Sequence, residues 1–267
     1  MKYAILSDIH ANLEAFQAVL AKCTELGVDQ YISLGDTVGY GVNPVECLDL
    51  LRSLNPIAVV KGNHDEFASN HDEIMEGFNQ HARAAILWTK HQLSRDDRYY
   101  LANLPMRVTP RGSNFTVVHA TLDSPEAWGY IFDTHHAADN FTYQFTPLCF
   151  CGHSHVPLVF CKKPVILHAG KPIEEVPEWA SSQVDAETAL KDGEFPLEMQ
   201  PGYKYLVNVG SVGQPRNRDP RASFAVFDSE ARVITRYVVP YDIGSAQQKI
   251  IAAGLPERLS YRLGIGS

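Results

Sequence analysis

Seven residues of types that bind transition metals follow short apolar runs in this 267-residue chain. They are two aspartates, one asparagine and four histidines: Asp8, His10, Asp36, Asn63, His119, His153 and His155. Such a mixed nitrogen and oxygen set suits Mn, Fe, Zn, Co or Ni better than Ca or Mg. Seven ligands are too many for one ion, so the set predicts two divalent transition-metal ions that share a carboxylate, with manganese favoured.

Such a pair of ions would suit phosphate chemistry. Two divalent ions and two carboxylates leave an excess charge of about +2, which attracts a phosphate and stabilises its transition state. Ions about 3.5–4 Å apart can also activate a water and stabilise both ends of an in-line displacement. The residue types therefore predict a two-metal phosphoesterase.

The elements that must position these residues are predicted strands, each of which ends just before one of the motifs. The first three lead from Tyr3–Leu6 to Asp8 and His10, from Tyr31–Leu34 to Gly35-Asp36, and from Ile57–Lys61 to Gly62-Asn63-His64-Asp65. The next three lead from Phe115–Val118 to His119, from Leu148–Cys151 to Gly152-His153-Ser154-His155, and from Tyr205–Val209 to Gly210-Ser211. Each motif alone could be a turn or an ordinary histidine. In open α/β sheets, however, ligands bind at the carboxyl ends of strands, so together the motifs predict one site.

Helical patterns separate the first three strands. Asn12 is a candidate N-cap for a helix to about Leu26, and Asn43-Pro44 opens a second helix. This β-α-β-α-β order predicts a parallel sheet with right-handed crossovers. Further along, we expect two helices between Phe78 and Leu104, the second with a capping box of Ser94 and Asp97. A hairpin of Ser223–Asp228 and Val233–Val239 and a short helix from Ser245 complete the prediction.

We expect one domain over residues 1–267, with an inserted segment at 164–202 that is rich in Glu, Pro and Asp. That segment could be a lid, a hairpin or a solvated loop, and we favour the loop. The formal net charge of −8 argues against a sequence-independent nucleic-acid binder, which needs a basic surface.

Neither a signal peptide nor a membrane span is evident, because no window approaches the ~20 apolar residues of a span. The five cysteines are an odd number in a large chain, so we expect reduced thiols and a cytoplasmic location. Cys149 and Cys151 are better explained as neighbours on one side of a buried strand than as metal ligands. The sequence does not indicate an oligomeric state.

Together, the motifs resemble those of the calcineurin-like metallophosphoesterase superfamily. Its pattern of D-x-H, GD, GNH[DE], a lone H and GH-x-H appears in order between residues 8 and 155. The segments Gly35–Gly41 (GDTVGYG) and Asn208–Arg216 (NVGSVGQPR) look like the small bacterial phosphodiesterase branch. The resemblance implies an α/β fold: a four-layer α/β/β/α sandwich of two mixed sheets flanked by helices.

The resemblance also implies a role for each residue. One ion would be held by Asp8, His10, Asp36 and His155, and the second by Asp36, Asn63, His119 and His153, so that Asp36 bridges them. His64 would be the catalytic residue, which faces the phosphate and protonates the leaving group or stabilises charge. Asp65 would shape the loop or support the ligands. Arg216 is a candidate substrate-binding residue or a solvated loop arginine, and Arg218 and Arg221 could contribute.

One departure from the family pattern bears on the substrate. The protein Ser/Thr phosphatases continue the second motif as GD-x-x-D-R-G, whereas this chain has Gly39 and Tyr40 at those positions. His64 therefore lacks a carboxylate partner and a phosphate-binding arginine is missing, which points away from phosphoproteins.

We therefore expect hydrolysis of a small phosphodiester, phosphomonoester or nucleotide pyrophosphate. The alternatives are a dinucleoside polyphosphate hydrolase, with phosphoprotein phosphatase as the runner-up, and a DNA nuclease is disfavoured by the acidic charge. A non-enzymatic scaffold is disfavoured too, because His64 and all seven candidate ligands are present.

Overall fold

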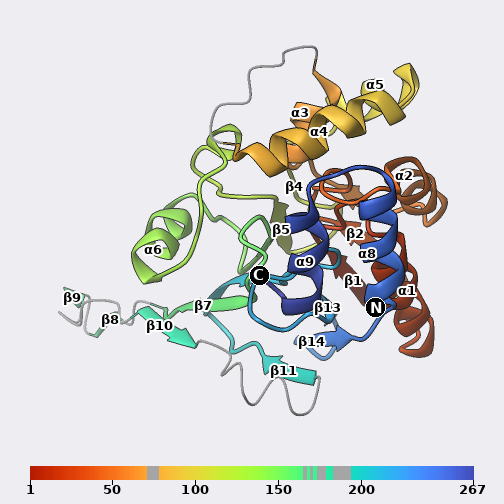
Figure 1. The fold of residues 1–267 in the computed structure, drawn as a ribbon. Helices are drawn as coiled ribbons and strands as arrows, with labels where there is room; N and C mark the ends of the chain where they lie inside the picture. Colours follow the sequence, from red (N-terminus) through yellow and green to blue (C-terminus); the bar gives the residue numbers. More distant parts are fainter. Residues whose placement is uncertain (71–77, 165–166, 169–170, 173–178, 183–193) are drawn as a thin grey trace.

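The structure is a computed structural model, and it describes residues 1–70, 78–164, 167–168, 171–172, 179–182 and 194–267. Two mixed sheets form its centre (Figure 1). The first sheet has the strand order β11-β14-β13-β1-β2-β3, and the second has the order β10-β7-β12-β6-β5-β4. Both sheets contain three neighbouring parallel strands: β1, β2 and β3 in the first, and β5, β6 and β12 in the second.

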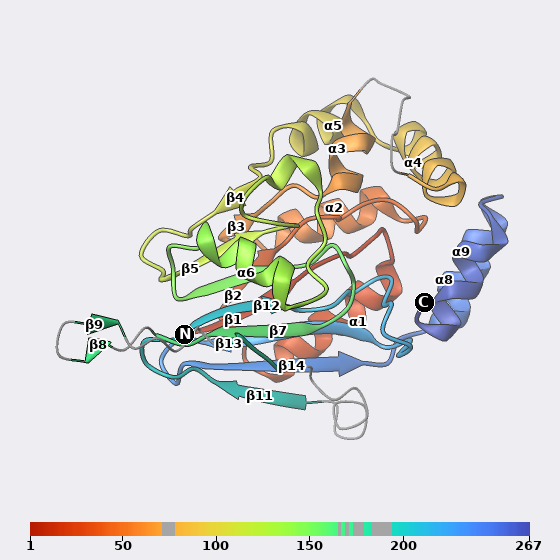
Figure 2. The same ribbon diagram turned by 90° about the vertical axis from the view of Figure 1, so that its left-hand side faces the viewer.

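The predicted strands are present with small shifts at their ends. The first sheet contains β1 (Lys2–Leu6), β2 (Gln30–Ser33), β3 (Ala58–Val59), β11 (Glu194–Glu198), β13 (Ala222–Asp228) and β14 (Val233–Val239). The second contains β4 (Arg107–Val108), β5 (Phe115–Val118), β6 (Leu148–Cys151), β7 (Leu158–Lys162), β10 (Trp179–Ser182) and β12 (Lys204–Asn208). Strand β14 runs parallel to β1, and its carboxyl end points toward α8 and α9 in Figure 2. The predicted hairpin of β13 and β14 is confirmed.

The α-helices in the described part of the chain are α1 (Leu13–Glu25), α2 (Pro44–Ser53), α3 (Asn63–Ser69), α4 (Gln80–Gln92), α5 (Arg95–Ala102), α6 (Thr134–Thr142), α8 (Ile243–Ala252) and α9 (Glu257–Ile265). Five of these eight helices, α1, α4, α5, α6 and α8, begin after a residue whose side chain caps them. The Asn12 side chain accepts a hydrogen bond from the backbone of Ala15, which confirms the predicted N-cap of α1. The capping box of Ser94 and Asp97 at α5 is also confirmed.

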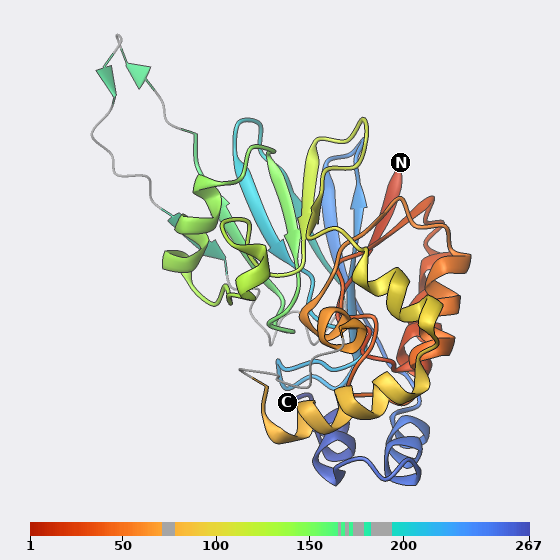
Figure 3. The same ribbon diagram turned by 90° about the horizontal axis from the view of Figure 1, so that it is seen from above.

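The elements form four layers, as the resemblance implied. Seen from above, the two sheets stand between α6 on one side and α1 and α2 on the other (Figure 3). The core between the sheets includes Ile5 and Ile32 from the first sheet and Val117, Phe150 and Val207 from the second, all buried. Separate apolar clusters join α1 to the first sheet and α6 to the second. The sandwich of two mixed sheets flanked by helices is therefore confirmed.

Several sequence predictions need correction. Residues 164–202 are not simply a solvated loop, because β10 pairs with β7 and β11 pairs with β14, so each strand extends one sheet. Strands β8 (Leu167–His168) and β9 (Lys171–Pro172) form a small hairpin of their own. The rest of that segment lies outside the described residues. We also did not predict α3, α6 and α9 as separate helices.

Other sequence features have simple outcomes. Cys149 and Cys151 lie in one apolar cluster on β6, and all five cysteines are free thiols. Within the residues that the structure describes, no helix is long and apolar enough to cross a membrane. The single-domain boundary at 1–267 stays a prediction.

Candidate metal centre

The predicted ligands converge at the carboxyl ends of the parallel strands. The carboxylate and imidazole atoms of Asp8, His10, Asp36 and His155 all lie within 4.8 Å of one another. Those of Asp36, His119 and His153 form a second group by the same measure, so Asp36 belongs to both. All six side chains are buried. Asn63, the seventh predicted ligand, lies beside them at the start of α3 and lines the same cavity.

Backbone carbonyls fix which nitrogen each of three histidines presents. A carbonyl can only accept a hydrogen bond, so the Nδ1 atoms of His10, His119 and His155 donate their protons. Their acceptors are the carbonyl oxygens of Val38 (3.1 Å), Leu34 (2.7 Å) and Gln214 (2.5 Å), respectively. The Nε2 atoms of all three rings then remain to face the cluster. Carbonyls that orient a ligating histidine through its other nitrogen are common at metal sites.

His153 is oriented the other way round. Its Nε2 atom lies 2.9 Å from the carbonyl oxygen of Trp128, which leaves Nδ1 as the atom available to the cluster. The ring is stacked on Tyr130, with the centroids 4.2 Å apart. Four backbone carbonyls therefore set the tautomers of the four imidazoles.

The geometry of His10 and His155 calls for a cation. Burial is the largest of the effects that hold the pKa of each ring well below its usual range, so both rings are neutral. With Nδ1 of each ring donating to a carbonyl, the two Nε2 lone pairs face each other at 3.1 Å. Two lone pairs repel at this distance unless a positive ion binds them both.

The two carboxylates also present free oxygens. Asp8 uses Oδ2 to accept hydrogen bonds from the Ser7 hydroxyl (2.6 Å) and the backbone N–H of His153 (3.1 Å). Its Oδ1 has no hydrogen-bond partner and lies 3.3 Å from Nε2 of His155. In Asp36, Oδ1 accepts from the N–H of His64 (2.8 Å), and Oδ2 lies 3.6 Å from Nε2 of His10.

The unpartnered atoms provide the test of whether metal ions fit. Buried and without a hydrogen bond are Oδ1 of Asp8, Oδ1 of Asn63 and Nε2 of His119, and the last lies 3.4 Å from Oδ2 of Asp36. A buried polar atom left without a partner costs about 1–3 kcal/mol, so several in one place need an explanation. Oxygen and nitrogen donors of this kind suit divalent transition metals. The residues present therefore fit the predicted pair of ions.

The backbone of this cluster is held in an unfavourable conformation. Asp8, His10, Asp36, His153 and His155 all have φ between 50° and 65°, the left-handed region. For residues other than glycine this region costs about 1–2 kcal/mol each, and such residues gather at functional sites. Five of the seven predicted ligands thus carry strain that the surrounding structure must offset.

Glycines in two motifs make room for the carboxylates. A Cβ atom at Gly62 would collide with Oδ1 of Asp36, and one at Gly152 would lie 2.6 Å from Oδ2 of Asp8. Any side chain at either position would displace a predicted ligand. This explains the glycine before Asn63 and the glycine before His153.

Asp65 shapes the loop, as predicted, and belongs to neither ligand group. Its carboxylate accepts hydrogen bonds from the backbone N–H groups of Asp36 (2.8 Å), Thr37 (2.9 Å) and Gly62 (3.1 Å). It therefore ties the loop after β2 to the start of α3. Burial and then the neighbouring Asp36 charge raise the pKa of Asp65 to about 7.

Charges within the cluster act on one another. Burial alone would raise the pKa of Asp36, but His119 and His64 hold it well below its usual range. Burial alone would lower the pKa of His119, whereas Asp36 raises it to about 9. The two opposite shifts reflect the mutual attraction of the Asp36 carboxylate and the His119 ring, and Nε2 of His119 must be free of a proton to bind a metal.

His64 lies next to the ligands without belonging to them. Its ring is buried against His10 and Tyr40, with centroids 4.7 and 4.4 Å away. Its Nδ1 atom has no partner, and the nearest atom to a Cβ built at Gly39 would be this nitrogen. A side chain at position 39 would collide with His64 in this conformation, and Gly39 provides no carboxylate partner for that ring.

An open cavity leads from the cluster to the surface. It is lined by the predicted site residues Asp36, Asn63, His64, His153 and His155, and also by Tyr40, Phe78, Tyr130, Arg216 and Arg262. Arg216 lines the cavity, and its role in substrate binding stays a prediction. Arg218 is exposed and outside the lining, while Arg221 is paired with Asp219 at 2.8 Å. Sequence reasoning did not find Tyr130 or Arg262, because neither stands next to a motif.

The fold and the cluster together define an α/β protein with buried Asp and His side chains at its strand ends that could hold metal ions. A family model described as the calcineurin-like phosphoesterase superfamily domain matches residues 1–188. The chain belongs to the calcineurin-like phosphoesterase superfamily.

Similar proteins support this assignment over the full length. The chain is 37% identical over 266 residues to an uncharacterized protein of Methanocaldococcus jannaschii, which covers 98% of this chain and 97% of that protein. A metallophosphoesterase from Sphaerobacter thermophilus has 39% identity and a TM-score of 0.79, covering 100% of this chain and 99% of that one. A hypothetical protein from Pyrococcus horikoshii, at 21% identity and a TM-score of 0.75 with 100% and 98% coverage, shares the fold.

Proposed function

We propose that this protein is a phosphohydrolase that uses two divalent transition-metal ions to hydrolyse a small phosphodiester, phosphomonoester or nucleotide pyrophosphate. The observation that carries the proposal is the convergence of buried, unpartnered donor atoms in two groups that share Asp36. The groups contain Asp8, His10 and His155 on one side and His119 and His153 on the other. When bound, the ions would supply positive charge and Lewis acidity for the phosphate.

We also assign Asn63 to the second group, since its Oδ1 atom has no hydrogen-bond partner and the residue lines the same cavity. Asp36 would be shared, because Oδ2 lies 3.6 Å from His10 and 3.4 Å from His119. Manganese is our first choice for both ions, and iron, zinc, cobalt and nickel also suit this donor set.

His64 is our proposed catalytic residue. It lines the cavity, and its backbone N–H holds Asp36 in place. Burial is the first of the effects that lower its pKa to about 4, so the ring is neutral near pH 7. A bound phosphate anion would raise that pKa, which would enable the ring to hold a proton for the leaving group.

The cavity walls favour a nucleotide among small substrates. Tyr130 lines the cavity and stacks on His153; it also stacks on Phe132, which lies outside the lining, with the two rings 5.1 Å apart and 9° from parallel. Phe132 is 53% exposed. An exposed aromatic face next to a phosphate site is suited to stacking of a nucleobase.

An activity screen on manganese-loaded protein tests the proposal. It compares a chromogenic phosphodiester, a phosphomonoester, a phosphopeptide and a dinucleoside tetraphosphate. We expect hydrolysis of one or more of the small substrates and little of the phosphopeptide, because Gly39 and Tyr40 replace the residues of the protein phosphatases. Metal analysis that finds no more than one site per chain would exclude the two-ion arrangement.

We also propose a cytoplasmic location, which the five free thiols support.

A further inference from the structure

Two arginines from distant parts of the chain face the cavity beside the same tyrosine. Nη2 of Arg216 lies 3.2 Å from the hydroxyl of Tyr40, and the two guanidinium carbons lie 5.7 Å (Arg216) and 6.0 Å (Arg262) from the centroid of the Tyr40 ring. Both arginines line the cavity above the metal cluster. The backbone N–H of Arg216 donates to the carbonyl of His155 (3.3 Å), so the backbone of Arg216 lies next to a predicted metal ligand. Arg262 comes from α9.

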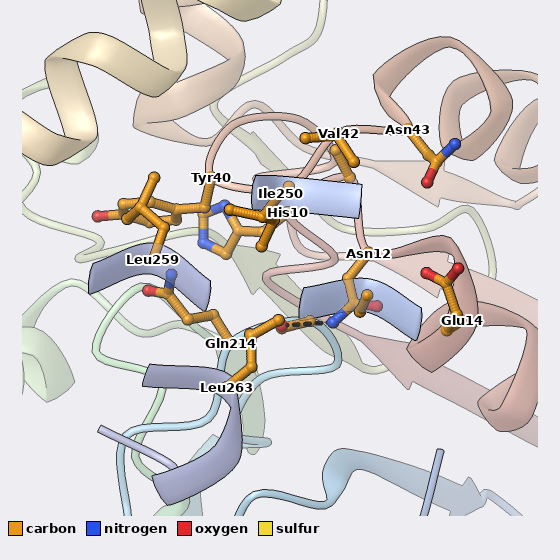
Figure 4. Close-up of a pocket in the computed structure, with 14 residues that line it drawn as sticks. His10, Asn12, Glu14, Tyr40, Val42, Asn43, Gln214, Ile250, Leu259 and Leu263 are labelled. Carbon is orange, nitrogen blue, oxygen red and sulfur yellow. Dashed lines mark hydrogen bonds between the residues drawn. The ribbon is translucent and has the colours of Figure 1, made fainter. Parts of the chain in front are cut away.

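The position of Arg262 is fixed by the packing of α9. Leu259 and Leu263, one turn apart, are buried with Tyr40 in the cluster that α8 and α9 share. Figure 4 shows both leucines and Ile250 around Tyr40 and His10. The side chain of Gln247 on α8 donates to the carbonyl of Ser260 on α9 at 2.9 Å. The core therefore holds α9 with Arg262 at the cavity.

Within the residues that the structure describes, neither cavity-lining arginine is paired with an aspartate or glutamate side chain, because none of the ion pairs involves Arg216 or Arg262. The polar contacts of Arg216 are the Tyr40 hydroxyl and Oε1 of Gln214 (3.1 Å), and its buried Nε has no partner. The Nε atom of Arg262 donates to the Ser267 oxygen.

The arginines also repel one another. Arg258, which is exposed and outside the cavity lining, stands four residues before Arg262 on α9, a spacing at which like charges destabilise a helix. Burial first, and then the charge of Arg216, lower the pKa of Arg262. Two guanidinium groups that line one cavity and have no aspartate or glutamate partner among the described residues are suited to binding an anion, since a guanidinium offers paired N–H donors to phosphate oxygens.

We propose that Arg216 and Arg262 form a second anion subsite beside the metal centre, and that the substrate carries a second phosphate joined to the one that is hydrolysed. The inference rests on the proposed function, in which the metal ions take the first phosphate. It narrows the substrate class to phosphoanhydrides, such as nucleoside diphosphate derivatives, over simple monoesters and diesters.

Calorimetric titration of the manganese-loaded protein tests this without turnover. The probes are inorganic phosphate, which has one phosphorus, and methylenediphosphonate, which has two and cannot be hydrolysed. We expect the wild type to bind the diphosphonate at least about tenfold more tightly than phosphate, the range of one or more charge-assisted hydrogen bonds.

The metal ions could also chelate a diphosphonate. Substitution of Arg262 distinguishes the contribution of this arginine to diphosphonate binding from that of the metal ions. Arg262→Met should weaken diphosphonate binding about tenfold and phosphate binding less than about threefold. Arg262→Lys, which keeps the charge, should fall between the wild type and Arg262→Met. Arg218→Met, which removes one exposed arginine from the loop of Arg216, should bind both probes like the wild type.

Three results would overturn the subsite: no preference in the wild type, an unchanged preference in Arg262→Met, or equal weakening of both probes. Arg262→Gln replaces Arg262→Met if the latter is unfolded at the assay temperature. Because binding alone is measured, absence of hydrolysis would refute the proposed function while this titration still decides the subsite.

Discussion

The two ends of the same sheets differ sharply in how their side chains are satisfied. At the amino end of the parallel strands, Tyr3, Phe115 and Phe227 form an aromatic cluster, with centroids 5.5 Å (Tyr3–Phe115) and 5.7 Å (Phe115–Phe227) apart. At the carboxyl end, buried polar atoms of Asp8 and His119 lack partners. The amino end has the ordinary contacts of a core. The carboxyl end has buried polar atoms without hydrogen-bond partners and a strained backbone.

This difference teaches which end stabilises the fold and which serves function. Unpaired buried groups and left-handed φ values at non-glycine residues each cost free energy, so they persist only where another part of the molecule offsets the cost. The aromatic end and the core between the sheets provide that offset. Substitutions at the two ends should therefore affect different properties.

The largest effect is expected from Asp36→Asn, which removes the carboxylate common to both ligand groups and so weakens the binding of both ions. We expect turnover to fall about a thousandfold or more, because even residues that only support a metal ligand cost about 10–100-fold. Metal content by mass spectrometry should fall in parallel. Asp228→Asn, at the opposite end of the first sheet, is the matched control and should retain metal and activity. A near-normal rate in Asp36→Asn would refute its shared role.

Phe115→Ala should show the reverse pattern. The side chain is buried and touches three aromatic rings. Its removal should lower the free energy of unfolding by about 3–5 kcal/mol, as for other buried phenylalanines. Denaturant titration measures this loss, while metal stoichiometry should stay at the wild-type value. Loss of metal from the folded variant would mean that the two ends are not independent.

His64→Gln should lower turnover about a hundredfold, within the range of general acid catalysis. The change should leave metal content intact, since His64 belongs to neither ligand group. The matched control is His81→Gln, a histidine of α4 outside the cavity lining. If His64→Gln instead strips the metal, His64 is a ligand and its role is misassigned.

The smallest effect is expected at Asp97, whose carboxylate is hydrogen-bonded to Ser94 and Arg52, unlike the unpartnered atoms of the candidate metal centre. Burial alone would raise its pKa, but Ser94 and Arg52, which lies 2.8 Å away, lower it. A lowered pKa stabilises the fold above the unfolded value, near 3.9, and this stabilisation is lost as the pH falls through the folded value.

Asp97→Asn should therefore cost about 1 kcal/mol at pH 7, the usual contribution of a helix cap. The difference from the wild type should shrink as the pH falls below about 4. Urea unfolding at pH 7 and pH 3.5 measures it. A difference that grows in acid would contradict the direction of the pKa shift.

The sequence predicted the strand ends that carry the candidate metal ligands better than the edge strands of the sheets. Asp8, Asp36 and His119 directly follow apolar strands, so the carboxyl-end rule was enough to bring them together. Strand β11 escaped prediction because it contains Pro196, which is normally excluded from sheets. Proline is tolerated in β11 because this strand lies at a sheet edge, where not every N–H needs a partner.

The cavity walls were harder to predict for a different reason. Arg262 reaches the cavity only because Leu259 and Leu263 pack on Tyr40, a contact between residues more than 200 positions apart. Helix α3 was also missed, because Gly62-Asn63-His64-Asp65 looks like a loop until the Asp65 carboxylate is seen to cap it. Local sequence patterns carry no information on contacts as distant in the chain as that of α9 with Tyr40.

The backbone carbonyls that orient the histidines have a consequence for how this protein can change in evolution. The oxygens of Leu34, Val38, Trp128 and Gln214 hold the imidazoles whatever side chains those four residues carry. No single substitution can delete a carbonyl, so the orientation of the imidazoles is protected from most mutations at these positions. The side chains of the cavity wall have no such protection, and substrate preference can diverge there while the histidine geometry is inherited unchanged.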